Sequence, residues 1–84
     1  PNPVSENATV RITFEKPMMA EVQIADINGK IIRTLQTMQM MPAGDHIFIW
    51  NRMNDAGSLC ANGTYRLILR GAHGINTLPV IIAE

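Results

Sequence analysis

The chain has 84 residues, a formal net charge of zero and a hydrophobic fraction of 46%. This length suits one domain, residues 1–84, with a small core. Without an excess of basic residues, nucleic acid is not expected as a partner. No apolar run approaches the ~20 residues of a membrane-spanning helix, so membrane insertion is not expected. The single cysteine, Cys60, excludes an internal disulfide.

The first half of the chain predicts three strands. Apolar and polar side chains alternate from Thr9 and again over about residues 20–27, which is typical of half-buried strands. The dipeptide Asn28-Gly29 follows and predicts a type I′ hairpin turn, because both residues tolerate positive φ. A third strand is predicted over residues 30–35.

The second half predicts three more strands and one long loop. Residues 36–41, QTMQMM, show no period and could form a loop or a continuing, ragged edge strand. The predicted strands are residues 46–50, 64–70 and 75–83, separated by a corner loop over residues 51–62 and a turn over residues 71–74. Pro79 cannot donate to a strand ladder, which predicts an edge or bulged position for the last strand.

Strands joined by short turns, with no helical period, predict an all-β fold, an antiparallel sandwich. The side chains expected in its core are Phe14, Val22, Ile24, Phe48, Trp50, Tyr65, Leu67 and Leu69. The residues expected to shape its turns are Asn28, Gly29, Gly57 and Gly63. Positive φ is predicted at Gly29, the second turn residue, and at Gly63, which ends a loop against a strand.

Residues that could carry chemistry are few. Asn51, Asn54 and Asp55 share a loop, but a calcium site needs six to eight oxygens, usually with several carboxylates, and this loop has one carboxylate. We therefore expect these three side chains to cap loop backbone. His46 and His73 have no paired carboxylate motif, so neither a catalytic triad nor a zinc site is indicated.

Cys60 has no histidine or basic residue near it in the sequence, and a reactive thiol needs a lowered pKa. A small buried side chain is the expected role. No catalytic residue, cofactor or metal is therefore expected, and the chain is not expected to be an enzyme.

Alternation places Ile47, Ile49 and Ile68 opposite the expected core side chains. Three outward isoleucines on adjoining strands would form a patch, and such patches mark contact surfaces. Met38, Met40 and Met41 could extend it as an adaptable surface, while Met18 and Met19 are expected to contact the core. The alternatives are β-propensity for the isoleucines and core filling for the methionines.

Several motifs together resemble a known family. In order they are Pro1-Asn2-Pro3, Thr9-Val10-Arg11-Ile12, Asp26-Ile27-Asn28-Gly29-Lys30, Ala43-Gly44-Asp45-His46, Trp50, Asn54-Asp55-Ala56-Gly57 and Ala61-Asn62-Gly63-Thr64-Tyr65-Arg66-Leu67. They resemble the type A C-terminal sorting domain of the bacterial type IX secretion system. The second half of the pattern is also similar to the immunoglobulin-like domain of the flagellar hook-capping protein. The resemblance implies an immunoglobulin-like sandwich of six or seven strands.

The sorting family also implies a function. Its members form the C-terminal domains of secreted enzymes and adhesins. They are recognised by an outer-membrane translocon and are often cleaved or joined to surface lipopolysaccharide. The start at Pro1 without a Met fits a C-terminal piece of a longer exported protein. The expected role is therefore a sorting and surface-anchoring signal, secreted or at the cell surface via the periplasm, with the translocon as partner. The alternative is a packing module in an extracellular assembly, such as a hook-cap-like domain, a filament subunit or a docking domain, whose partners are its parent protein or neighbouring subunits.

Two positions depart from the sorting pattern. The family often has Gly two residues after the Trp, where this chain has Arg52. Its closing strand is often lysine-rich, whereas residues 77–84, TLPVIIAE, contain no Lys. The second departure concerns sorting and leaves the predicted fold unchanged.

Overall fold

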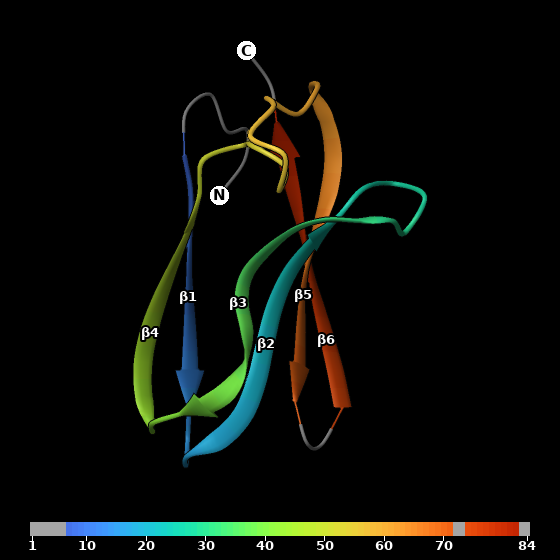
Figure 1. Ribbon diagram of the computed structural model, residues 1–84. Helices are drawn as coiled ribbons and strands as arrows, with labels where there is room; N and C mark the ends of the chain where they lie inside the picture. Colours follow the sequence, from blue (N-terminus) through green and yellow to red (C-terminus); the bar gives the residue numbers. More distant parts are fainter. Residues whose placement is uncertain (1–6, 72–73, 83–84) are drawn as a thin grey trace.

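The computed structural model describes residues 7–71 and 74–82, and its regular structure there is entirely strand (Figure 1). The strands are β1 (Ala8–Phe14), β2 (Met18–Ala25), β3 (Ile31–Met41), β4 (Gly44–Trp50), β5 (Gly63–Gly71) and β6 (Gly74–Ile82). They form a two-stranded sheet, β1-β4, and a four-stranded sheet of order β3-β2-β5-β6, with every pair antiparallel. The predicted all-β sandwich is confirmed. Within the described residues, no helix is long and apolar enough to cross a membrane.

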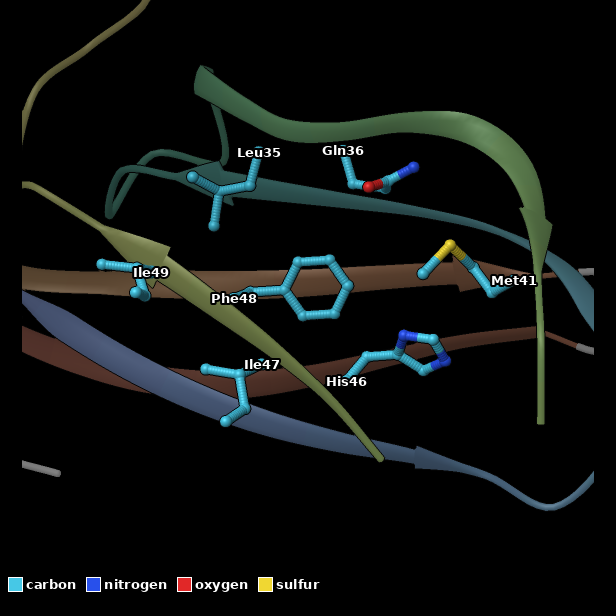
Figure 2. Close-up of a pocket in the computed structure, with 7 residues that line it drawn as sticks. All are labelled: Leu35, Gln36, Met41, His46, Ile47, Phe48 and Ile49. Carbon is cyan, nitrogen blue, oxygen red and sulfur yellow. The ribbon is translucent and has the colours of Figure 1, made fainter. Parts of the chain in front are cut away.

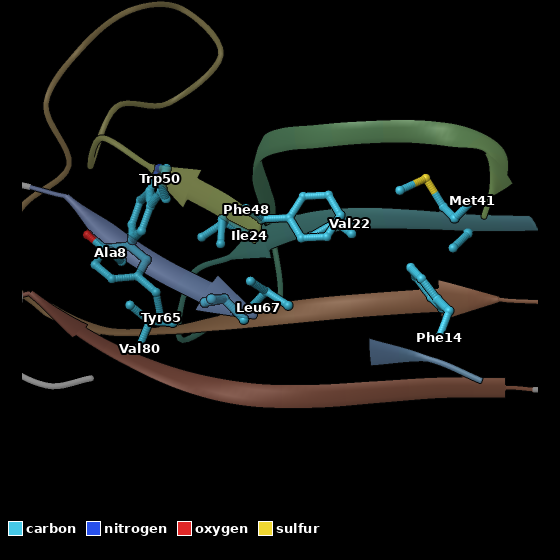
Figure 3. Packing of buried hydrophobic residues seen from close by; sticks show 12 residues of the cluster. Ala8, Phe14, Val22, Ile24, Met41, Phe48, Trp50, Tyr65, Leu67 and Val80 are labelled. Atoms are coloured by element: carbon cyan, nitrogen blue, oxygen red, sulfur yellow. The ribbon is translucent and has the colours of Figure 1, made fainter. Parts of the chain in front are cut away.

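The core lies between the two sheets (Figure 3). Each sheet turns one side of its alternating pattern inward, so Val22 and Ile24 of β2 are fully covered and Phe48 and Trp50 of β4 lie opposite them. The expected core side chains are buried except Leu69, which packs against the cluster while only partly buried. The buried cluster comprises Ala8, Val10, Phe14, Ala20, Val22, Ile24, Met41, Phe48, Trp50, Tyr65, Leu67 and Val80.

The first hairpin turns one step earlier than predicted. β2 ends at Ala25, and the carbonyl of Asp26 accepts a hydrogen bond from the Gly29 amide at 3.0 Å. Gly29 has the expected positive φ, +83°, but Asn28 does not share it, so the predicted type I′ turn at Asn28-Gly29 is wrong. The Asp26 carboxylate accepts from the amides of Asn28 and Lys30. This side-chain capture centres the turn on residues 27–28 and leaves the left-handed position to Gly29.

β3 continues to Met41, so residues 36–41 are the ragged edge strand rather than a loop. Its register against β2 shifts between Ala20 and Val22 and at two further points. Each such irregularity interrupts the alternation of side chains, which explains why this segment has no period in the sequence. Met41 is only 8% exposed and belongs to the core, so its placement on an outer contact surface is wrong.

β6 lies at the edge of the four-stranded sheet, with Pro79 opposite Arg66 in register. This agrees with the edge position that a proline in a strand predicts. Gly63, where β5 begins, has the predicted positive φ, +156°. The predictions concerning Pro1-Asn2-Pro3, His73, the middle of the turn at residues 71–74 and the last two residues lie outside the described residues.

Replacing Trp50 with Ala should lower the free energy of unfolding by about 3–5 kcal/mol, the usual cost of truncating a buried aromatic side chain. Trp50 is 1% exposed, and its indole N–H donates to the Met53 carbonyl at 2.9 Å. Urea denaturation measures the loss. Ile27→Ala is the matched control, because Ile27 is 80% exposed and its truncation should change stability by about 0.5 kcal/mol or less. A loss below about 1 kcal/mol for Trp50→Ala would contradict this core assignment.

Candidate interaction surfaces

The corner loop, residues 51–62, is held by its own polar side chains. The Asn54 side-chain oxygen accepts from the amides of Ala56 and Ser58, both at 3.0 Å. The Asn51 oxygen accepts from the Met53 amide at 3.2 Å. These oxygens therefore bind backbone, which is the structural role that the sequence predicts for them.

The same loop is attached to β3 through Asp55. The Asp55 amide donates to the Ile32 carbonyl at 2.9 Å, and its carboxylate accepts from the Thr34 amide at 3.1 Å. The carboxylate also lies 3.8 Å from Nε of Arg33. The pair is largely exposed on the Asp55 side, so its main effect is to fix the position of the loop.

Arg52 occupies the position where the sorting family often has Gly. Its φ is +67°, in the left-handed region that glycine adopts without steric cost. The Arg52 carbonyl accepts from the Cys60 amide at 2.7 Å, which closes the loop across its base. This chain adopts the left-handed conformation with an arginine that is buried, at 9% exposure.

Tyr65 fastens the far end of the loop. Its hydroxyl donates to the Ala61 carbonyl at 2.6 Å, four residues earlier. A tyrosine at a strand corner that bonds back to the preceding backbone is the tyrosine corner of immunoglobulin-like sandwiches. Burial raises the pKa of Tyr65, with smaller contributions in the same direction from Cys60 and Asp26. The phenol is therefore a protonated donor at neutral pH.

Cys60 packs against the core from this loop and is half-buried. Burial raises the pKa of its thiol, against an opposing effect of Arg33. His46 lies at the rim of the core, with its ring centroid 5.3 Å from that of Phe14 and its Nε2 2.8 Å from the Pro42 carbonyl. Among the described residues, no group of three or more His, Cys, Asp or Glu could hold a metal ion.

The outer side of the two-stranded sheet carries what we call the isoleucine face: Ile47 and Ile49 of β4 with their register partners Arg11 and Thr9 of β1. Ile47 and Ile49 are 59% and 58% exposed, so alternation placed both correctly. β4 is paired on one side by β1, and within the described residues no strand pairs with its other edge. The face therefore adjoins a row of unpaired backbone groups.

Ile68 does not belong to this face. It lies on β5 in the opposite, four-stranded sheet, in register with Gln23 and Thr77, and is half-buried. The predicted patch of three isoleucines is therefore wrong. Alternation predicts which side of its own sheet a residue faces. It does not predict which of the two sheets the strand joins.

A groove of about 350 Å³ runs along the free edge of β4 (Figure 2). Leu35, Gln36 and Met41 of β3 form one wall, and residues 46–49 of β4 form the other. Phe48 points toward β3 in this view, while Ile47 points away from it. The groove exists because the two-stranded sheet is too narrow to cover the inner side of β3.

Exposed methionines gather on the four-stranded sheet. Met38 and Met40 of β3 are 46% and 59% exposed, and Met40 is paired in register with Met19 of β2, which is 40% exposed. The expected core contact of Met19 is therefore wrong. We call Met19, Met38 and Met40 the methionine cluster; it lies on a different sheet from the isoleucine face.

Two antiparallel sheets around one core, with a tryptophan packed on a tyrosine corner, define an immunoglobulin-like domain. The family model described as FlgD Ig-like domain matches residues 4–74, and the chain belongs to this family. This supports the likeness to the domain of the flagellar hook-capping protein. A search of curated proteins gave no significant match. The likeness to the type IX sorting domain stays a prediction.

Cys60 should alkylate slowly in the folded domain. Because its pKa is raised, its thiolate fraction at pH 8 is lower than in the unfolded chain, and only the thiolate reacts. The rate of alkylation by iodoacetamide is measured by mass spectrometry over a series of pH values. The pH at which this rate increases should be higher for the folded protein than for the protein unfolded in urea. Equal rates in both states across pH 7–9.5 would show that the fold does not protect the thiol.

Proposed function

We propose that the domain is a non-catalytic packing module that joins a neighbouring subunit of an extracellular assembly through its isoleucine face. The observation that carries this proposal is the pair of isoleucines, each more than half exposed, beside the unpaired edge of β4. Exposed edges in natural sheets are usually protected by charge, proline or a bulge. β4 has Asp45 near its start but isoleucine and aromatic residues along the rest of its length.

The chemistry of the face indicates what the partner surface should offer. Ile47 and Ile49 require an apolar patch, and Arg11, which is exposed opposite Ile47, favours a carboxylate on the partner. Asp45, at the end of the face, already accepts a hydrogen bond from Thr13 at 2.6 Å. The cation of Arg11 is therefore the charge that a neighbouring subunit would complement.

The energy available from this contact is moderate. Full burial of an isoleucine side chain stabilises by roughly 1.5–3 kcal/mol, before the cost of association is subtracted. Because Ile47 and Ile49 are already partly covered, their contribution lies toward the lower end of that range. The face then suits one contact among several in an assembly better than a tight binary complex.

The double substitution Ile47→Thr, Ile49→Thr tests the proposal. Threonine keeps the β-branch, so the isolated domain should retain its stability within about 1 kcal/mol. In the full chain that carries the domain, the assembled fraction should fall, as measured by sedimentation velocity and cross-linking. Ile27→Thr is the matched control, since Ile27 is exposed on the hairpin, away from the face.

Three outcomes would overturn the packing proposal. Unfolding of the double variant would show that the two isoleucines belong to the core. An unchanged assembled fraction would show that the exposure reflects β-propensity alone. A dimer of the isolated domain that disappears in the double variant would assign the face to a second copy instead.

The second candidate is the sorting and surface-anchoring signal of type IX secretion. It is supported by the ordered motifs from Pro1 to Leu67. The absence of Lys from residues 77–84 is the departure that bears on it. Under this proposal the outer-membrane translocon is the partner and the cell surface the destination.

An export assay tests the sorting candidate. Residues 1–84, fused behind a signal peptide and a reporter, should carry the reporter across the outer membrane of a bacterium that has this system. Cell fractionation measures the outcome, with an established sorting domain on the same reporter as the positive control. A reporter held in the periplasm, while the control exports it, would exclude sorting and leave the packing proposal standing.

A further inference from the structure

We propose that the methionine cluster, Met19, Met38 and Met40, is a binding site for a soft monovalent metal ion, Cu(I). Thioether sulfur is a soft, neutral ligand, and soft ligands select Cu(I) over hard cations such as Mg²⁺ and Ca²⁺. Met19 and Met40 are register partners on two paired strands, and Met38 is exposed two residues before Met40.

Strand register brings Met19 and Met40 together. Met19 and Met40 are directly opposite each other, which places their Cα atoms roughly 4.5–5.5 Å apart in an antiparallel pair. Met38 lies two residues before Met40 on β3, about 7 Å along the strand, beside the register shift opposite Glu21, and it is also exposed. Each methionine has three rotatable side-chain bonds, so the sulfur atoms can converge on one ion without a backbone change.

Burial separates these methionines from those that serve packing. Met41 is in the core at 8% exposure, and its register partner Met18 is half-buried, with its methyl group against Gly71. The cluster residues are 40–59% exposed, so solvent and ions reach their side chains. A packing role explains Met18 and Met41 but not the three that point outward.

The electrostatic surroundings are compatible with a bound cation. Glu21 lies two residues from Met19 on the same side of β2, with its carboxylate 3.6 Å from the guanidinium of Arg70. Thioether ligands leave the charge of Cu(I) uncompensated, and the pair of Glu21 and Arg70 adds no net positive charge beside the ion. The paired segments that carry Met19 and Met40 are residues 18–20 of β2 and residues 39–41 of β3, and neither segment contains a basic residue.

An anaerobic competition titration against a chromophoric Cu(I) chelator tests the site. It should be done with the Cys60→Ala variant, because the free thiol is itself a soft ligand. The domain should withdraw one Cu(I) per chain from the chelator. Each of Met19→Leu, Met38→Leu and Met40→Leu should weaken binding by about tenfold or more, equivalent to about 1.4 kcal/mol, and the triple variant should abolish it.

Met53→Leu is the matched control, because Met53 is the methionine of the corner loop and lies outside both the core and the cluster. NMR of ¹³C-methyl-labelled methionine, with Ag(I) as a redox-stable probe, gives a second readout. The methyl signals of Met19, Met38 and Met40 should shift while that of Met53 does not. Failure of the parent to compete for Cu(I), equal binding by the folded triple variant, or Ag(I) shifts outside the cluster would each overturn the proposal.

Discussion

The contact between Trp50 and Tyr65 is the constraint on which the rest of the structure depends. Trp50 ends β4 in one sheet and Tyr65 lies near the start of β5 in the other, with ring centroids 5.3 Å apart at 68° (Figure 3). This edge-to-face arrangement is favoured between aromatic rings. Both polar groups are also satisfied by the connecting loop, the indole N–H at Met53 and the hydroxyl at Ala61. One aromatic pair therefore joins the two sheets and fixes both ends of the loop.

The loop between these anchors acts as a scaffold. Asn54 and Asp55 direct their oxygens to backbone amides, and Asp55 extends the attachment to β3. Arg52 adopts a left-handed backbone conformation that costs a non-glycine residue roughly 1–2 kcal/mol, and its carbonyl accepts the hydrogen bond from the Cys60 amide that closes the loop. These hydrogen bonds hold the loop in one position against β3.

The outer surfaces of the two sheets differ because the sheets are unequal. Two strands face four, so the free edge of β4 and the inner side of β3 do not cover each other, and the groove forms between them. The isoleucine face lies outside β4, and the methionine cluster lies on the β2–β3 pair of the other sheet. The proposed subunit contact and the proposed metal site can therefore be changed independently by substitution.

The sequence by itself determined six strands, although it left open whether the third continues over residues 36–41, together with the sides of β1, β2, β4 and β5 that face the core and the left-handed glycine at position 29. These properties follow from alternation and turn chemistry between near neighbours, so a single chain segment encodes them. Tertiary structure decided the rest. Strand pairing placed Ile68 on the opposite sheet from Ile47 and brought Met19 beside Met40. β3 continues through its register shifts to Met41, which is buried. Alternation along a strand encodes which side of its sheet each side chain faces. Which strand pairs with which depends on contacts between residues that are distant in sequence.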